Sequence, residues 1–69
     1  MSSFVVIYDR RNGHSSVHEY SGPDSHRRAF AERLRLESEN HDSEVEIVSL
    51  VSDSLESIKR THSRYFANA

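Results

Sequence analysis

The fold is decided by residues 4–20, which read FVVIYDRRNGHSSVHEY. Two β-prone runs flank the dipeptide Asn12-Gly13, the strongest short-range signal for a two-residue hairpin turn. Both residue types tolerate the positive φ that a type I′ turn requires. We therefore expect an antiparallel hairpin in which this dipeptide alone forms the turn.

A two-residue turn also predicts which side chains share each face of the hairpin. The predicted cross-strand pairs are Tyr8–Val17, Val6–Glu19, Ile7–His18 and Val5–Tyr20. One face then carries Phe4, Val6, Tyr8 and Val17, and the other carries Val5, Ile7, His18 and Tyr20. The first strand is apolar on both faces, so each face needs a cover.

The rest of the chain predicts a helix, a third strand and a second helix. Residues 21–24 (SGPD) end the second strand and begin a helix that extends to about residue 38 or 40, with Pro23 in its first turn and Ser or Asp as its cap. Residues 45–51 (VEIVSLV) form the third strand. A second helix covers about residues 52–66, with Asp53 and Glu56 at the spacing of a capping box.

This order, ββαβα, predicts an α+β fold in one small domain, residues 1–66, followed by a frayed tail at residues 67–69. A right-handed crossover through the first helix returns the third strand parallel to the second. If the crossover passes over the first strand, the sheet order is 2-1-3. The arrangement is a split β-α-β unit, similar to part of a ferredoxin-like fold.

The two predicted helices differ in how clearly their sequences specify them. The second has one apolar stripe, formed by Leu55, Ile58, His62, Tyr65 and Phe66. Its acidic residues lie at the start and its basic residues towards the end, as the helix dipole favours. In the first helix Phe30 and Leu34 share a face, whereas Ala29 and Leu36 lie well round from them. Its first turns are basic and its last are acidic, against the dipole.

Composition restricts how such a chain is stabilised. It has 69 residues and no cysteine, which excludes disulfides and thiolate metal sites. Domains of this size are near the lower limit for independent folding, so oligomerisation is the remaining common route. No segment has the length of a membrane span and the N-terminus lacks signal-peptide features, which predicts a cytoplasmic protein with no membrane partner.

The charge of the chain is divided along its length. Residues 1–36 hold six arginines against four carboxylates (+2), and residues 37–69 hold three basic groups against seven carboxylates (−4). The net charge of −2 counts against a general nucleic-acid binder. The acidic run from Glu37 to Glu46 is a solvated link or meets the basic half of a second subunit.

Covering both sheet faces leaves two alternatives. If both helices lie on one face, the other is an apolar surface that a second copy or another protein would cover. Alternatively, the second helix crosses to the opposite face and completes the monomer. On the first alternative, one hairpin face meets the partner. The predicted interface residues are Val5, Ile7, His18, Tyr20, Val48 and Leu50.

A second candidate site lies at the start of the first helix. Free helix amides and basic side chains together suit a phosphate or carboxylate. The predicted anion-binding residues are Gly22, Ser25, His26, Arg27 and Arg28. The alternative is a solvated surface with ordinary ion pairs. A nucleic-acid-binding function would use Arg10, Arg11, Arg27, Arg28 and Arg35.

Metal and catalytic motifs are weak in this sequence. His14 and His18 would lie about 13 Å apart on a strand, too far to share one zinc ion. His62 lies on an apolar stripe and is expected to be a packed residue. We predict no cofactor, metal ion or catalytic residue, and rank a small hydrolase or nuclease last. The sequence favours a non-enzymatic interaction or regulatory module that forms a homodimer or docks on another protein; the alternative is a nucleic-acid- or anion-binding domain.

Overall fold

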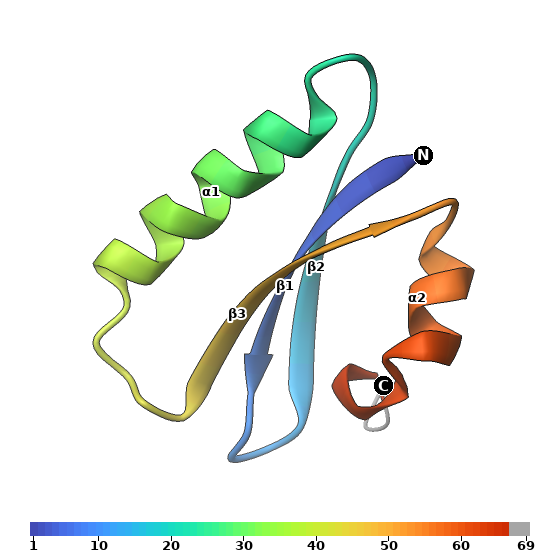
Figure 1. Ribbon diagram of the computed structural model, residues 1–69. Helices are drawn as coiled ribbons and strands as arrows, with labels where there is room; N and C mark the ends of the chain where they lie inside the picture. The colour runs from blue at the N-terminus through green and yellow to red at the C-terminus, as the bar shows by residue number, and fades with distance from the viewer. Residues whose placement is uncertain (67–69) are drawn as a thin grey trace.

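The computed structural model describes residues 1–66, and the predicted tail at residues 67–69 lies outside the described residues. The elements are β1 (Ser2–Asp9), β2 (His14–Tyr20), α1 (Ser25–Glu39), β3 (Val45–Ser52), α2 (Leu55–Thr61) and one turn of 3-10 helix, η1 (Ser63–Tyr65) (Figure 1). The predicted α+β class and the order ββαβα are confirmed.

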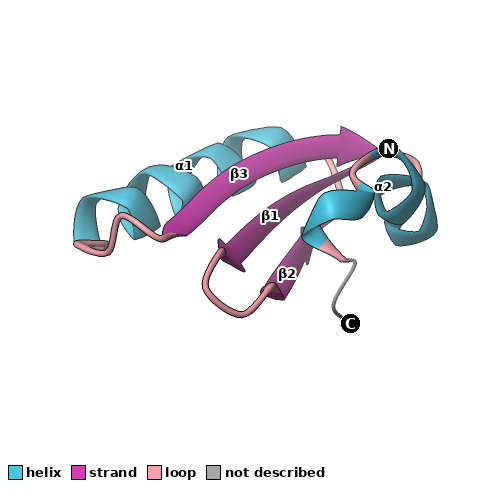
Figure 2. Ribbon diagram, turned by 90° about the horizontal axis from the view of Figure 1, so that it is seen from below, coloured by secondary structure: helices cyan, strands magenta, loops and turns pink. Residues whose placement is uncertain are grey.

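The three strands form one antiparallel sheet in the order β2-β1-β3, as the sequence predicted. β1 is antiparallel to both of its neighbours, so β3 runs parallel to β2. β1 lies between the other two strands in Figure 2. The likeness to a ferredoxin-like fold stays a loose comparison of strand arrangement.

The hairpin loop is longer than predicted, because Asp9 organises four residues instead of two. β1 ends at Asp9, which pairs with His14, so residues 10–13 form the loop. The Asp9 carboxylate accepts hydrogen bonds from the backbone and the guanidinium of Arg11, at 3.0 and 3.2 Å. Gly13 has φ +76°, whereas no other residue type has positive φ among the described residues. A type I′ turn at Asn12-Gly13 is therefore wrong, since it needs positive φ at both residues.

The longer loop moves the hairpin register by two residues and leaves the faces unchanged. The observed pairs are Val5–His18, Val6–Val17, Ile7–Ser16 and Tyr8–Ser15, and the four predicted pairs are wrong. Because side chains alternate with a period of two, a shift of two keeps each residue on its predicted face. On β3, Val48 and Leu50 pair with Val6 and Phe4 and share their face.

The two helices cover opposite faces of the sheet (Figures 1 and 2). On one face, Ile58 of α2 and Tyr65 of η1 pack against Phe4 and Val6 to form the main core. On the other, α1 lies over the face of Val5, which is fully buried. The alternative in which the second helix completes the monomer is therefore the one that the structure shows.

The second helix begins later and ends earlier than predicted. Ser54, not Asp53, is its N-cap, and the Ser54 hydroxyl accepts a hydrogen bond from the Ser57 amide at 3.1 Å. At His62 the backbone leaves helical geometry, with φ −126° and ψ 49°. This change of direction leads into η1, where Tyr65 reaches β3. The predicted stripe is otherwise confirmed, because Leu55, Ile58, Tyr65 and Phe66 all join the core.

Candidate functional site

α1 packs on the sheet through small side chains. Ser25 and Ala29 are its two buried residues, with 3% and 1% of their surface exposed. Leu36 lies on the same side as Ser25, because it follows Ser25 by eleven residues and eleven residues make close to three full turns. Small residues let a helix lie close to a sheet, and this close approach directs the opposite side of α1 to solvent.

The large apolar side chains of α1 lie away from its buried side, with Phe30 rotated from Ala29 by about 100°, on the flank, and Leu34 by about 140°. Phe30 is 51% exposed and Leu34 is 48% exposed. The Arg33 guanidinium lies 5.5 Å from the centre of the Phe30 ring and pairs with Glu37 at 3.2 Å. These contacts cover part of the ring from its own helix. An exposed Phe-Leu pair one turn apart is a feature of helices that bind a partner.

A third exposed apolar residue, Val51, lies on β3 and is 54% exposed. It shares the sheet face of its β1 neighbour Ser3, which is the face that α1 covers. β3 is an edge strand, and within residues 1–66 it pairs with β1 alone. We call Phe30, Leu34 and Val51 the α1–β3 surface. The sequence placed Phe30 and Leu34 on one face of the helix but did not predict that this face is the outer one.

The six predicted interface residues do not lie together. Val5, Ile7, His18 and Tyr20 share one sheet face, whereas Val48 and Leu50 share the other. The first face lies under α1, and the second lies under α2 and η1. Since helices of the same chain cover both faces, a partner that binds this structure meets other residues first.

The predicted anion-binding residues have partners within the chain. Arg28 donates to the Ser21 carbonyl and lies 5.7 Å from the centre of the Tyr20 ring. Arg27 pairs with Asp24 at 3.7 Å, and His26 Nδ1 lies 2.5 Å from Ser3 Oγ. The Gly22 carbonyl accepts a hydrogen bond from the Ser25 amide at 3.2 Å, and the Ser25 side chain is buried. These contacts close the loop between β2 and α1, and anion binding here stays a prediction.

The arginines proposed for nucleic-acid binding fall into separate groups. Arg27 and Arg28 lie at the start of α1, and Arg10 and Arg11 contact the loop that follows its end. A helix of 15 residues is about 22 Å long, so these pairs lie at opposite ends of the molecule. Arg35 binds Glu32 and Glu39 at 2.6 and 3.0 Å. The described geometry does not gather the five into one basic surface.

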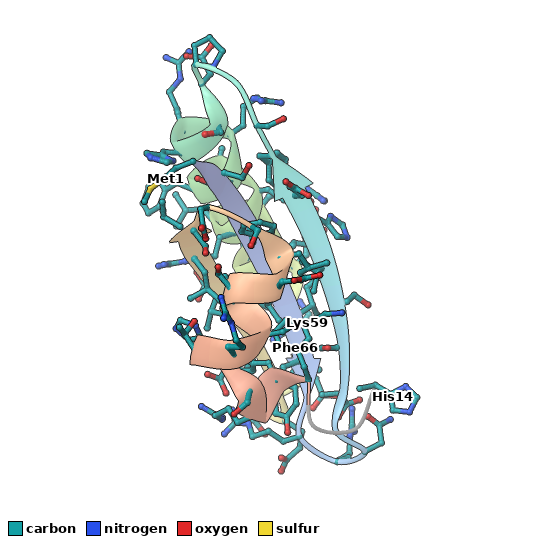
Figure 3. The ribbon with its side chains drawn as sticks, turned by 90° about the vertical axis from the view of Figure 1, so that its right-hand side faces the viewer. Met1, His14, Lys59 and Phe66 are labelled. Atoms are coloured by element: carbon teal, nitrogen blue, oxygen red, sulfur yellow. The ribbon has the colours of Figure 1, made fainter. Side chains whose placement is uncertain are left out.

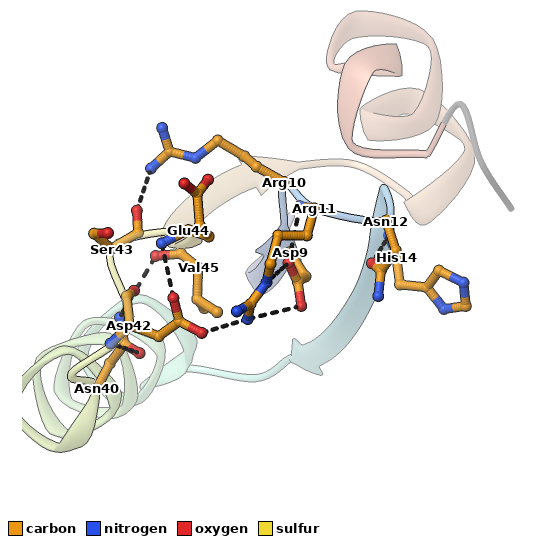
Figure 4. Close-up of polar contacts among 10 residues, drawn as sticks. All are labelled: Asp9, Arg10, Arg11, Asn12, His14, Asn40, Asp42, Ser43, Glu44 and Val45. Atoms are coloured by element: carbon orange, nitrogen blue, oxygen red, sulfur yellow. Dashed lines mark hydrogen bonds and ion pairs between the residues drawn. The ribbon is translucent and has the colours of Figure 1, made fainter.

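Arg10 and Arg11 join the hairpin loop to the loop after α1 (Figure 4). Arg11 bridges the carboxylates of Asp9 and Asp42, and this contact holds the pKa of Asp9 below its ordinary value. Arg10 donates its amide to the Glu44 carbonyl at 2.9 Å and its guanidinium to the Ser43 carbonyl at 3.1 Å. The acidic link thus meets arginines of its own chain, which aligns the end of α1 with the start of β3.

A polar and aromatic cluster anchors η1 to the sheet. The Tyr65 hydroxyl donates to Glu46 at 2.7 Å, and Arg64 pairs with the same carboxylate at 2.9 Å. The Tyr65 ring meets the Tyr8 ring edge to face at 5.2 Å. The hydrogen bond from Tyr65 and the nearby Arg64 lower the pKa of Glu46, while burial and Glu46 raise the pKa of Tyr65. The sequence did not predict this cluster, because the register of β3 on β1 determines it.

The histidines lie apart from one another. His14 begins β2 at the hairpin end, at the lower right of Figure 3, and His18 lies four residues further along the same strand. His62 is half-buried, with its ring stacked against Tyr65 at 6.4 Å. Among residues 1–66 no three His, Cys, Asp or Glu side chains are grouped so as to hold a metal ion.

Comparison of the chain with known protein families, with characterised proteins and with solved structures gave no match. In the described part of the chain, neither helix has the length and apolar character needed to cross a membrane.

Proposed function

We propose that this chain is a small protein-interaction module whose binding surface is the α1–β3 surface. The observation that carries the proposal is the half-exposed pair Phe30 and Leu34 on α1, a helix that also contacts the apolar edge strand β3. Both sheet faces are covered by helices, so Phe30, Leu34 and Val51 are the large apolar groups that α1 and β3 leave exposed; Met1, just before β1, is exposed as well. A regulatory role and a cytoplasmic location belong to the same proposal and stay predictions.

Apolar burial favours a protein partner. A few side chains that enter a dry pocket supply most of the binding energy at protein interfaces, and aromatic residues are enriched among the residues there. Full burial of one Phe or Leu side chain contributes roughly 1.5–3 kcal/mol. Phe30 and Leu34 are already held on a regular helix, so binding costs little further ordering of the backbone.

A site-specific photocrosslink tests the proposal. p-Benzoylphenylalanine replaces Phe30 in the cells that make the protein, and the matched control carries the same group at the exposed position of His18 on β2. We expect protein adducts at position 30, few at position 18, and loss of the adducts when Leu34→Asp is added. Equal labelling at both positions, or no adduct at position 30, would contradict the proposal.

A further inference from the structure

The outer edge of β3 lacks the features that keep edge strands from pairing. Its residues 45–51 (VEIVSLV) include one charged residue, Glu46, and no Lys, Pro or Gly. Glu46 is held by Tyr65 and Arg64 on the face of α2. Native edge strands are normally protected by charges, proline, bulges or a covering element. β3 pairs with β1 and with no other described strand. The Val45 amide donates to the Asp42 carbonyl and the Val45 carbonyl accepts from Asn40, so the edge open to another strand begins after Val45.

The opposite edge of the sheet has a different character. β2 reads HSSVHEY, and His14, Ser16, His18 and Glu19 are exposed on it. A polar strand of this kind gives another chain little apolar surface to bury. The chain thus keeps one edge polar and the other apolar, and β3 is the edge suited to a further strand.

The sequence of β3 is self-complementary in an antiparallel pair. A two-fold axis perpendicular to the sheet sets residues of the same face opposite one another. With the axis at Ser49, Val48 faces Leu50 of the second copy and Ile47 faces Val51. Glu46 then faces Ser52, so no like charges are opposed. With the axis at Val48, Glu46 would face Leu50, which leaves a carboxylate opposite an apolar side chain.

The position of Phe30 along α1 agrees with the same axis. His26 Nδ1 lies 2.5 Å from Ser3 Oγ, so His26 is level with Ser3. Four residues of helix advance about 6 Å, close to the roughly 6.6 Å of two strand residues. α1 runs along β1, since the loop after it contacts Arg11. Phe30 is therefore level with Val5, and Val5 pairs with Ser49.

Phe30 also lies on the correct side of α1. The Arg28 guanidinium lies over Tyr20, which places that side of the helix towards β2. Two residues further on, Phe30 is rotated by about 200° and so lies towards β3. Leu34 follows one turn later on the same side. The exposed ring is thus level with Ser49 and close to the expected axis.

From the open apolar edge of β3, its self-complementary sequence and the position of Phe30, we infer that the chain forms a homodimer. In this homodimer two β3 strands pair antiparallel about an axis at Ser49. The two sheets become continuous, and the α1 helices of both copies lie side by side with their Phe30 rings near the axis. The dimer covers Phe30, Leu34 and Val51 together. This inference rests on the proposed function, and it names a second copy of the chain as the partner.

Sedimentation of the pure protein tests the assembly. We expect a species of about twice the 8.0 kDa chain mass. Phe30→Asp and Val51→Lys each change an exposed residue, and we expect both to yield monomers whose circular dichroism is that of the folded chain. The matched control is Ser16→Lys on the other edge, which should remain dimeric. A wild-type protein that sediments as a monomer at all concentrations would overturn the inference.

A single cysteine tests the register, because the natural chain has none. Directly opposed residues of an antiparallel pair have Cα atoms about 4.5–5.5 Å apart, within the range of a disulfide. Ser49→Cys should therefore oxidise to a covalent dimer, whereas Ser16→Cys should form no covalent link and keep the covalent mass of one chain. A dimer that Ser49→Cys does not link would overturn the axis at this residue. If the chain is monomeric but position 30 crosslinks to a different protein, the homodimer is wrong and the proposed function stands.

Discussion

The shorter helix of this protein places a large apolar side chain in the main core, whereas the longer helix buries only small ones. α2 has 7 residues, yet its Ile58 is 1% exposed and lies in the main core. α1 has 15 residues, yet it buries only Ser25 and Ala29 and exposes Phe30 and Leu34. The short helix holds its sheet face by apolar burial, whereas the long one lies close through small residues and polar contacts at its ends.

This difference separates the residues needed for folding from those free to bind. If the same residues of a helix served both folding and binding, a substitution that improved binding would lower the stability of the fold. Here the outer side of α1 contributes little to the core, so substitutions there should affect association more than folding.

Truncation of the main apolar residue of α2 should have the largest effect. Ile58→Ala removes a fully buried side chain and leaves a cavity, so it should lower the free energy of unfolding by about 2–5 kcal/mol. A domain of this size has a total stability of only a few kcal/mol, so this variant should be largely unfolded by circular dichroism. Ile58→Val, which keeps most of the volume, should cost about 0.5–1.5 kcal/mol and remain measurable by urea denaturation.

The matched control on α1 is Leu34→Ala, measured at high dilution so that self-association contributes little. Because Leu34 is 48% exposed, its loss should change the free energy of unfolding by no more than about 0.5 kcal/mol. Similar losses at Leu34 and Ile58 would show that the outer side of α1 is part of the core, which contradicts the comparison.

Enlarging the side chain at the contact between α1 and the sheet should have the second largest effect. Ala29 is 1% exposed, and Ala29→Leu places extra methyl groups at a buried position of α1. Such overpacking costs about 1–3 kcal/mol. Ala31→Leu on the exposed side is the control and should be within about 0.5 kcal/mol of the natural chain. Thermal unfolding of both variants gives the difference, and equal effects would mean that α1 is not seated through Ala29.

The sequence predicted the sheet better than it predicted how α1 is oriented. The faces of the hairpin residues were correct because an alternation of period two survives a register shift of two residues, even though the hairpin turn was wrong. Val48 and Leu50, which were grouped with Val5, lie on the other face. The shift goes with the longer loop, in which the Asp9 carboxylate accepts a hydrogen bond from the Arg11 amide. The preference of Asn-Gly for two-residue turns takes no account of this side-chain contact. On α1, the sequence placed Phe30 and Leu34 on one face and Ala29 on another, and in the structure the side of Ala29 is the buried one. No local pattern distinguishes these alternatives, because the sheet beneath the helix selects between them.

The caps of the two helices should differ as well. The Ser54 hydroxyl accepts the Ser57 amide, so Ser54→Ala should cost about 1 kcal/mol. Asp24 holds the same position on α1 but makes no side-chain cap hydrogen bond. Asp24→Ala removes only an exposed ion pair with Arg27, and should cost less than about 0.5 kcal/mol. Urea denaturation of the two variants side by side measures this, and a larger loss at Asp24 would reverse the expected order.

The smallest effect should be the pH dependence of the stability that Glu46 contributes on the sheet face covered by α2 and η1. The hydrogen bond from Tyr65 and the charge of Arg64 lower the pKa of Glu46 below the ordinary value of 4.5. The folded chain therefore binds fewer protons there than the unfolded chain, so this contribution is complete above the ordinary pKa and is lost as the pH falls through the folded one. Glu46→Gln should cost up to about 1 kcal/mol at neutral pH and nothing once both states are protonated. The other carboxylates with lowered pKa values, Asp9, Glu32 and Asp53, remain in both proteins and cancel in the difference. A difference in stability that stays constant from neutral to acid pH would show that Glu46 does not hold η1 through its charge.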